Sequence, residues 1–235
     1  MASGSLRLTG YERTLWLTAV WIEIYILPIG NKLSVSMKLS ERNKSVGRPR
    51  GFEEERVLEA VMNTFWEKGY EGTSFKDLFE ATGLHKASLY QAFGDKHQLF
   101  LKALGFYIEQ TFKEVAASAY SSDSPMENLR SLLSGINTLC LKGNGCMLLN
   151  SLVEVAPHDP DVKEMIERSH TIKKRFLADM IDKAQRSGEI TTEQDPERLA
   201  AILMVALAGV AATVKGFSGA DHTSQVLEDI LASWV

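Results

Sequence analysis

The sequence predicts an all-α protein, in which an N-terminal unit of three helices is joined by a long helix to a larger helical domain. Apolar residues recur at helical spacing along most of the chain, and glycine, proline and capping residues divide these stretches. No alternating pattern of useful strand length interrupts them. With 235 residues, 45% of them hydrophobic, the chain can bury the core of one large or two small domains.

Residues 1–46 are predicted to be an extension with little order. Leu15–Ile29 is apolar, but it contains Glu23, it is shorter than the roughly 20 residues that span a bilayer, and it lacks the cleavage signature of a signal peptide. Three interpretations remain open. The segment is a non-native start with Met37 as the natural first residue, a helix that packs on the protein or a partner, or a membrane anchor.

A first helix is predicted at Glu53–Lys68, and two short helical patterns that meet at a glycine follow it in residues 73–100. Thr73 or Ser74 can cap the first of these two helices, and Gly83 can end it, because glycine tolerates the left-handed backbone that closes a helix. The residues of this helix expected to face a core are Phe75, Leu78 and Phe79.

The second short helix is predicted at about His85–Phe93, where Leu89 and Phe93 bury one face, and a new helix begins at Asp95. This arrangement is typical of a helix-turn-helix, whose second helix lies in the major groove of DNA. The pattern alone leaves an alternative, a helical hairpin whose polar residues are only solvated.

The run Leu84-His85-Lys86-Ala87-Ser88-Leu89-Tyr90, followed by Phe93 and Lys96, resembles the DNA-binding domain of TetR-family transcriptional regulators. The helix Glu53–Lys68 and the segment Gly69–Ser74 share this resemblance, which covers roughly Gly47 to Leu104. Ala92 departs from it, because the family often has an aromatic residue or histidine there; we expect no DNA contact from Ala92 and an unchanged fold.

The resemblance implies a role for each matching position. Lys86, Ala87 and Ser88 lie where the recognition helix meets base edges, and Gln91 either reads adenine or faces water. The resemblance implies phosphate contacts from Tyr90 and Lys96, and backbone or groove contacts from Thr73 and Lys76.

Upstream of the first helix lies a basic arm that contains Lys38, Arg42, Lys44, Arg48 and Arg50. Its end, Gly47–Gly51, is expected to be extended and flexible. Arginines on such an arm can enter a narrow minor groove or lie along phosphates, and the alternative is a solvated tail.

Residues 101–235 are predicted to form a helical effector-binding and dimerisation domain after residues 47–100, the DNA-binding domain. The expected helices are Asp95–Ala119, Pro125–Leu141, Met147–Val155, Pro160–Arg186, Pro196–Val214 and Ser224–Trp234. Leu199–Val214 is apolar nearly all round, so it must be buried on more than one side. The resemblance implies that the last two helices form a homodimer interface; the alternative is a core helix within one subunit.

The resemblance also implies a small-molecule effector in this domain. The candidate pocket or sensor residues are Phe106, Cys140, Cys146, Met147, Phe176 and Met180, and each of them can instead be plain core. The two cysteines flank a glycine-containing break with Lys142 between them, and a cation near a thiol lowers its pKa and raises its reactivity.

Enzyme chemistry finds no support in the sequence: the five histidines lack paired zinc spacing, and there is no phosphate-cradling glycine loop. We expect no metal, no cofactor and, with two cysteines, a cytoplasmic location. The net charge of −4 means that DNA affinity must come from local patches. The sequence therefore predicts a homodimeric regulator, most often a repressor, that binds a palindromic operator and responds to an effector. The alternative is a helical ligand-binding or adaptor protein that does not bind DNA.

Overall fold

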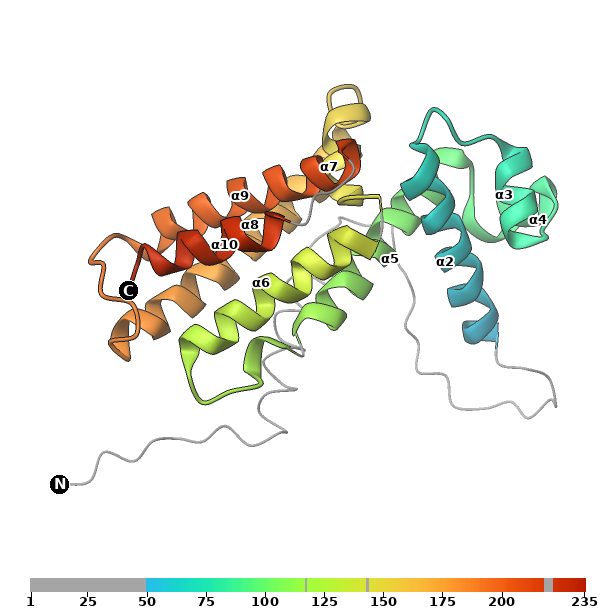
Figure 1. Ribbon diagram of the computed structural model, residues 1–235. Helices are drawn as coiled ribbons and strands as arrows, with labels where there is room; N and C mark the ends of the chain where they lie inside the picture. Colours follow the sequence, from blue (N-terminus) through green and yellow to red (C-terminus); the bar gives the residue numbers. More distant parts are fainter. Residues whose placement is uncertain (1–49, 117, 143, 218–221) are drawn as a thin grey trace. The chain divides into compact units, whose positions relative to one another are not determined.

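The computed structural model describes residues 50–116, 118–142, 144–217 and 222–235, and these are helical with no strand among them (Figure 1). The N-terminal unit consists of α2 (Arg50–Lys68), α3 (Phe75–Thr82) and α4 (Lys86–Phe93). The other elements are α5 (Lys96–Ala116), the short 3-10 helix η1 (Ser118–Tyr120), α6 (Pro125–Lys142), α7 (Met147–Glu154), α8 (Pro160–Arg186), α9 (Pro196–Gly216) and α10 (Thr223–Ala232). The predicted all-α class is confirmed.

Local capping chemistry sets the ends of α3 as the sequence predicts. The hydroxyl of Ser74 accepts the N–H of Asp77, and the carboxylate of Asp77 accepts the N–H of Ser74, so two N–H groups that the helix leaves unpaired are satisfied reciprocally. Gly83 closes the helix with a φ of 71°, and its N–H donates to the carbonyl of Phe79. The left-handed backbone at Gly83 strongly favours glycine.

Helix α4 follows an extended His85, and α5 begins one residue after Asp95. The carboxylate of Asp95 accepts the N–H of Gln98 at 2.8 Å, which is the N-cap bond expected of this aspartate. Leu89 and Phe93 are buried, as predicted, and hold α4 on the core.

Two expectations about the N-terminal unit are wrong. Gly47–Gly51 was expected to be extended, but α2 already begins at Arg50. Phe79 was expected to face a core; it is 40% exposed and stacks on the His85 ring at a centroid distance of 5.1 Å. The predicted extension 1–46 and Arg48 lie outside the described residues.

Two clusters of buried apolar side chains form the core. The first joins α2, α3, α4 and the first half of α5 to α7 and the start of α8, through residues such as Phe65, Leu78, Phe100, Met147 and Val162. The second joins the end of α5 to α6, α9, α10 and the rest of α8. Helices α5 and α8 therefore contribute to both clusters, and α7 packs with the N-terminal unit.

Helix α9 packs against α6, α7, α8 and α10, and α8, α9 and α10 lie side by side (Figure 1, orange to red). Leu199, Leu203 and Val210 are buried, whereas Ile202 and Val205 are exposed, Val205 by 74%. Among the described helices α9 is long and apolar enough to cross a membrane, a criterion that an apolar core helix also meets. In the single chain this helix is thus only partly buried, although its composition predicts burial on more than one side.

Candidate nucleic-acid interface

The outward face of α4 is polar and accessible. Lys86, Ala87, Ser88 and Gln91 are exposed, while Leu89 on the opposite face is buried. Hydroxyl, amide and ammonium groups on one short helix can donate to base edges in the major groove, and Gln91 can also accept. The fold thus brings these four predicted contact residues onto one surface.

The aromatic rings of Phe75 and Tyr90 pack next to the exposed residues of α4. The Tyr90 ring packs edge-on against Phe75 at a centroid distance of 5.0 Å, and the Lys86 ammonium lies 4.5 Å from the Phe75 ring centre and 5.3 Å from that of Tyr90. A cation over the face of an aromatic ring is attracted by the ring's quadrupole. These contacts orient Lys86 at the start of α4, and Tyr90 is half-buried with its ring packed.

Two further lysines flank α4. Lys96 lies in the first turn of α5, with its ammonium 4.6 Å from the centre of the Tyr70 ring. Lys76 on α3 is exposed and lies 3.8 Å from Glu80. A lysine at a helix N-terminus combines its charge with unpaired backbone N–H groups, which suits a phosphate.

Thr73 is the exception among the predicted contacts. It is 1% exposed, and its hydroxyl donates to the carbonyl of Gly69 at 2.6 Å. Its side chain therefore closes the turn before α3 and does not reach the surface, which corrects its prediction as a DNA contact. Arg50 lies at the start of α2, and Arg48 is outside the described residues.

An ion pair that sequence reasoning missed connects α2 to α3. Lys68 at the end of α2 donates to the carboxylate of Asp77, which is also the capping partner of Ser74. Hydrogen bonds from Lys68, and then from Ser74, hold the pKa of Asp77 well below its ordinary value. A capping-box aspartate is visible in the sequence, but its lysine partner nine residues away is not.

The predicted effector residues do not form one site. Met147 is buried in the first core cluster, and the partly buried Cys146 and Phe106 pack against that cluster, whereas Phe176 and Met180 are buried in the second cluster. Cys140 is 6% exposed, and burial raises the pKa of its thiol to about 11. The lowered pKa expected from Lys142 is therefore wrong for Cys140, because Lys142 is exposed and burial dominates at the thiol.

Cys146 occupies a different environment at the N-cap position of α7. It lies beside Tyr107, whose pKa is raised by burial first and by this thiol second. Lys173 on α8 is close to Cys146 and Cys140, and burial lowers the pKa of its ammonium. This group of side chains from α5, α6, α7 and α8 was not visible in the sequence, where they are up to 66 residues apart (Tyr107 to Lys173).

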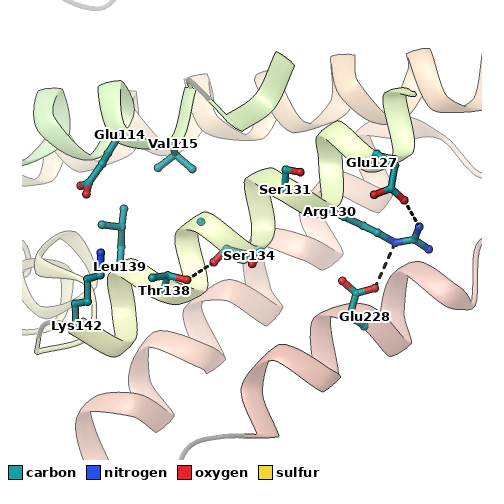
Figure 2. Close-up of a pocket in the computed structure, with 11 residues that line it drawn as sticks. Glu114, Val115, Glu127, Arg130, Ser131, Ser134, Thr138, Leu139, Lys142 and Glu228 are labelled. Carbon is teal, nitrogen blue, oxygen red and sulfur yellow. Dashed lines mark hydrogen bonds and ion pairs between the residues drawn. The ribbon is translucent and has the colours of Figure 1, made fainter. Parts of the chain in front are cut away.

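A groove of about 620 Å³ runs along α6 and is lined from α5, α6 and α10 (Figure 2). Arg130 lies between Glu127 at 2.7 Å and Glu228 at 3.3 Å, so two carboxylates face its single positive charge. The groove also contains Glu114, Ser134, Thr138 and Lys142. None of the predicted pocket residues lines it: Cys140, Met147, Phe176 and Met180 are buried in the core, and Phe106 and Cys146 are partly buried.

Folding also places His97 beside the N-cap of α8. The Nε2 atom of His97 lies 2.7 Å from Asp159, and Asp161 offers a further carboxylate within 4.8 Å. However, Asp159 uses its other oxygen to accept the N–H groups of Asp161 and Val162. The positive end of a helix disfavours a cation, so the pair is better explained as a contact that joins α5 to α8.

Comparison with known proteins agrees with this fold along both halves of the chain. Residues 57–103 match the family described as "Bacterial regulatory proteins, tetR family", and residues 127–229 match the "Tetracyclin repressor-like, C-terminal domain". The uncharacterised HTH-type transcriptional regulator YezE of Bacillus subtilis is 33% identical over 63% of this chain and 78% of its own length. The HTH-type transcriptional repressor ComR of Escherichia coli is 27% identical over 81% and 93%, respectively.

Solved structures show the same architecture. The regulator CifR, as a cysteine mutant complexed with 26-base-pair double-strand operator DNA, has a TM-score of 0.70 and 26% identity, covering 80% of this chain and all of that one. A regulator from Chloroflexus aurantiacus is 22% identical with a TM-score of 0.71, over 77% of this chain and 93% of its own. This chain belongs to the TetR family of bacterial regulatory proteins, and it is an HTH-type transcriptional regulator.

Proposed function

We propose that the protein is a homodimeric repressor, in which α4 of each subunit reads one half of a palindromic operator and an effector releases the DNA. The observation that carries the proposal is the exposed polar face of α4, held by a buried opposite face and by capped neighbouring helices. One helix of eight residues reads few base pairs, whereas two that lie a DNA turn apart read a specific site.

Within this proposal the contacts divide into two kinds. Lys86, Ala87, Ser88 and Gln91 face the bases, where they set sequence preference. The contacts to the sugar-phosphate backbone come from Tyr90, Lys96 and Lys76, with Arg48 of the arm and Arg50 at the start of α2 as further candidates. Such contacts set register and affinity and carry little sequence information.

The dimer interface is assigned to α9 and α10. Ile202 and Val205 on α9 and Val226 on α10 are large apolar side chains left exposed in the single chain. A second copy that packs its own α9 and α10 on this surface would remove them from water, at about 25 cal/mol per Å² of apolar area. Such an interface also gives a reason for a helix as long and apolar as α9 in a DNA-binding protein.

A gel shift on DNA that flanks the gene, and on fragments selected from a random pool, tests the central proposal. We expect a retarded complex whose affinity falls steeply with salt, because binding releases counterions from the phosphates. A protein that selects no sequence and shows no salt-dependent shift would instead be the alternative, a ligand-binding or adaptor protein without enzymatic activity.

For the effector, the thiol environments favour Cys146 over Cys140 as the group that meets a reactive compound. With a pKa of about 11, Cys140 is thiolate in only about one molecule in a thousand at pH 8, and the thiolate is the nucleophile. We expect a reactive aldehyde or quinone to modify Cys146 first and to release the operator. Cys146→Ser should abolish the release and Cys140→Ser should preserve it. Modification of Cys146 that leaves operator binding unchanged would reject the reactive-sensor part of the proposal.

A further inference from the structure

The carboxylate of Glu154, the last residue of α7, binds the turn that joins α2 to α3. Its Oε2 accepts the backbone N–H of Tyr70 at 3.1 Å, and its Oε1 accepts that of Glu71 at 2.9 Å. Both oxygens of one carboxylate thus bind two successive backbone amides of this turn. Hydrogen bonds to an ionised acceptor are stronger than those between neutral groups.

The turn is shaped for this carboxylate. Gly69 has a φ of 76°, and a β-carbon there would lie 2.8 Å from both carboxylate oxygens of Glu154. Any side chain at this position would therefore be strained and would also displace the carboxylate. The close approach of Glu154 depends on this glycine.

The position of the turn decides where the DNA-facing residues lie. It leads directly into Ser74, the N-cap of α3. The Tyr70 ring packs against Phe100 at a centroid distance of 4.8 Å and supports the ammonium of Lys96. A shift of this turn would therefore move α3, which packs with α4, and Lys96 together.

The other end of α7 touches the helix assigned to the dimer interface. Gly145, with a φ of 76°, lies so close to α9 that a β-carbon would be 2.6 Å from the carbonyl oxygen of Ala211. Between these ends α7 is anchored by buried Met147, Leu148 and Ser151. Its eight residues span about 12 Å as one rigid rod, so α7 links the backbone of α9 to the turn of the N-terminal unit.

We propose that Glu154 is a positioning residue for operator recognition, which ties the N-terminal unit through α7 to α9 and thereby sets the separation of the two α4 helices in a dimer. The inference rests on the proposed function, since a separation has meaning only for a dimer on a two-part operator. Glu154 touches no DNA in this role, so its effect is on half-site spacing and not on base preference.

The test measures binding to the selected operator and to versions with one base pair added or removed between the half-sites, by fluorescence anisotropy. We expect wild-type protein to bind the best-spaced operator at least about tenfold more tightly than the others. Two α4 helices at a fixed separation cannot both fit half-sites at a different spacing without losing affinity. Glu154→Ala should bind the best-spaced operator within about threefold of wild type and discriminate among spacings by less than about threefold. If the Glu154 carboxylate only stabilises the fold, Glu154→Ala should lower the melting temperature and leave the spacing preference unchanged.

Matched variants make the result decisive. Glu164→Ala removes an exposed carboxylate of the same charge from α8 and should keep the wild-type spacing preference. Glu154→Gln keeps one acceptor oxygen and should fall between wild type and Glu154→Ala; it also decides the question if the alanine variant does not fold. Hydrogen exchange at the Tyr70 and Glu71 amides should quicken in both Glu154 variants.

The outcomes separate the two proposals. If wild-type protein binds no operator, the proposed function fails. If it binds with a clear spacing preference and Glu154→Ala and Glu154→Gln retain that preference, operator binding stands and the positioning role of Glu154 is overturned.

Discussion

Helices α4 and α9 both present side chains to solvent, but of opposite character. The outward face of α4 carries Lys86, Ser88 and Gln91, and that of α9 carries Ile202 and Val205. Polar groups lose nothing by facing water, so their exposure alone does not reveal a partner. A large apolar patch in water is unfavourable, and it marks a surface that another molecule covers.

The two surfaces therefore need different kinds of support. For α9 the exposed apolar side chains already favour a partner, and the proposed second copy of the chain would cover them. For α4 the polar face became informative only with the geometry around it, a helix-turn-helix with capped ends, and with membership of a family of DNA-binding regulators. The following changes test whether the two surfaces act as this contrast implies.

The largest effect is expected for Val205→Asp on α9. A charge in the centre of an apolar dimer interface must be desolvated without a partner, so the dimer should dissociate and operator affinity should fall on the order of 100-fold. Light scattering after size exclusion gives the mass, and anisotropy gives the affinity. Val153→Asp, at a valine of almost equal exposure (73% against 74%) on α7, is the control and should remain dimeric. If Val205→Asp remains dimeric, the dimer interface does not include this part of α9.

The next effect is expected for Ser88→Ala and Lys86→Ala on α4. Loss of a base-edge contact should change the preference at particular base pairs by about 1–3 kcal/mol, while the mass of the dimer stays the same. Selection from a random pool with each variant shows which positions relax. If both variants select the same sequence as wild type, neither side chain contacts a base, and both only face solvent.

A smaller and more uniform effect is expected for Lys96→Ala in the first turn of α5. A phosphate contact contributes equally to every sequence, so affinity should fall by a similar factor for specific and nonspecific DNA. The slope of log affinity against log salt should decrease by about one. Lys163→Ala, at an exposed lysine of α8, is the matched control and should leave the slope unchanged. A loss confined to one operator sequence would instead make Lys96 a base-reading residue.

The smallest effect is expected for Ser74→Ala. Loss of the N-cap should destabilise α3 by about 1 kcal/mol, measured as a lower midpoint in urea. The proposed dimer through α9 should be unaffected, because the capping box lies wholly within the N-terminal unit. Ser134→Ala, at an exposed serine inside α6, should not lower the midpoint. Equal midpoints for Ser74→Ala and wild type would show that the Asp77 bonds alone hold the turn.

Much of the N-terminal unit could be predicted because its structure depends on neighbours in the chain. The capping pair Ser74 and Asp77 is three residues apart, and Gly83 closes α3 through a bond to Phe79. The same reasoning failed for Phe79 and Thr73, whose spacing and polarity predicted the wrong environment. The spacing of apolar residues does not show whether a neighbouring helix covers the Phe79 ring. The hydroxyl of Thr73 could bond either to DNA or to the nearby backbone, and polarity alone does not distinguish the two.

The effector half was less predictable for a related reason. Cysteines flanking a glycine break with a lysine between them predict a reactive thiol, yet the pKa of Cys140 is raised because α6 turns it inward. The neighbours that matter to Cys146, Tyr107 and Lys173, come from α5 and α8. A pKa depends on what surrounds a group in space, and no spacing along one helix contains that information.

By itself, the sequence determined that the chain is helical and where most of its helices begin and end to within a few residues, because caps, glycines and prolines act on backbone groups within about four residues. Asp159 and Asp195, each followed by proline, open α8 and α9 for that reason. Only the tertiary structure decided which apolar residues of α9 remain exposed and that Glu154 meets amides 84 and 83 residues away. Those outcomes depend on how whole helices pack, where many weak contacts compete and none has a signature in the local sequence.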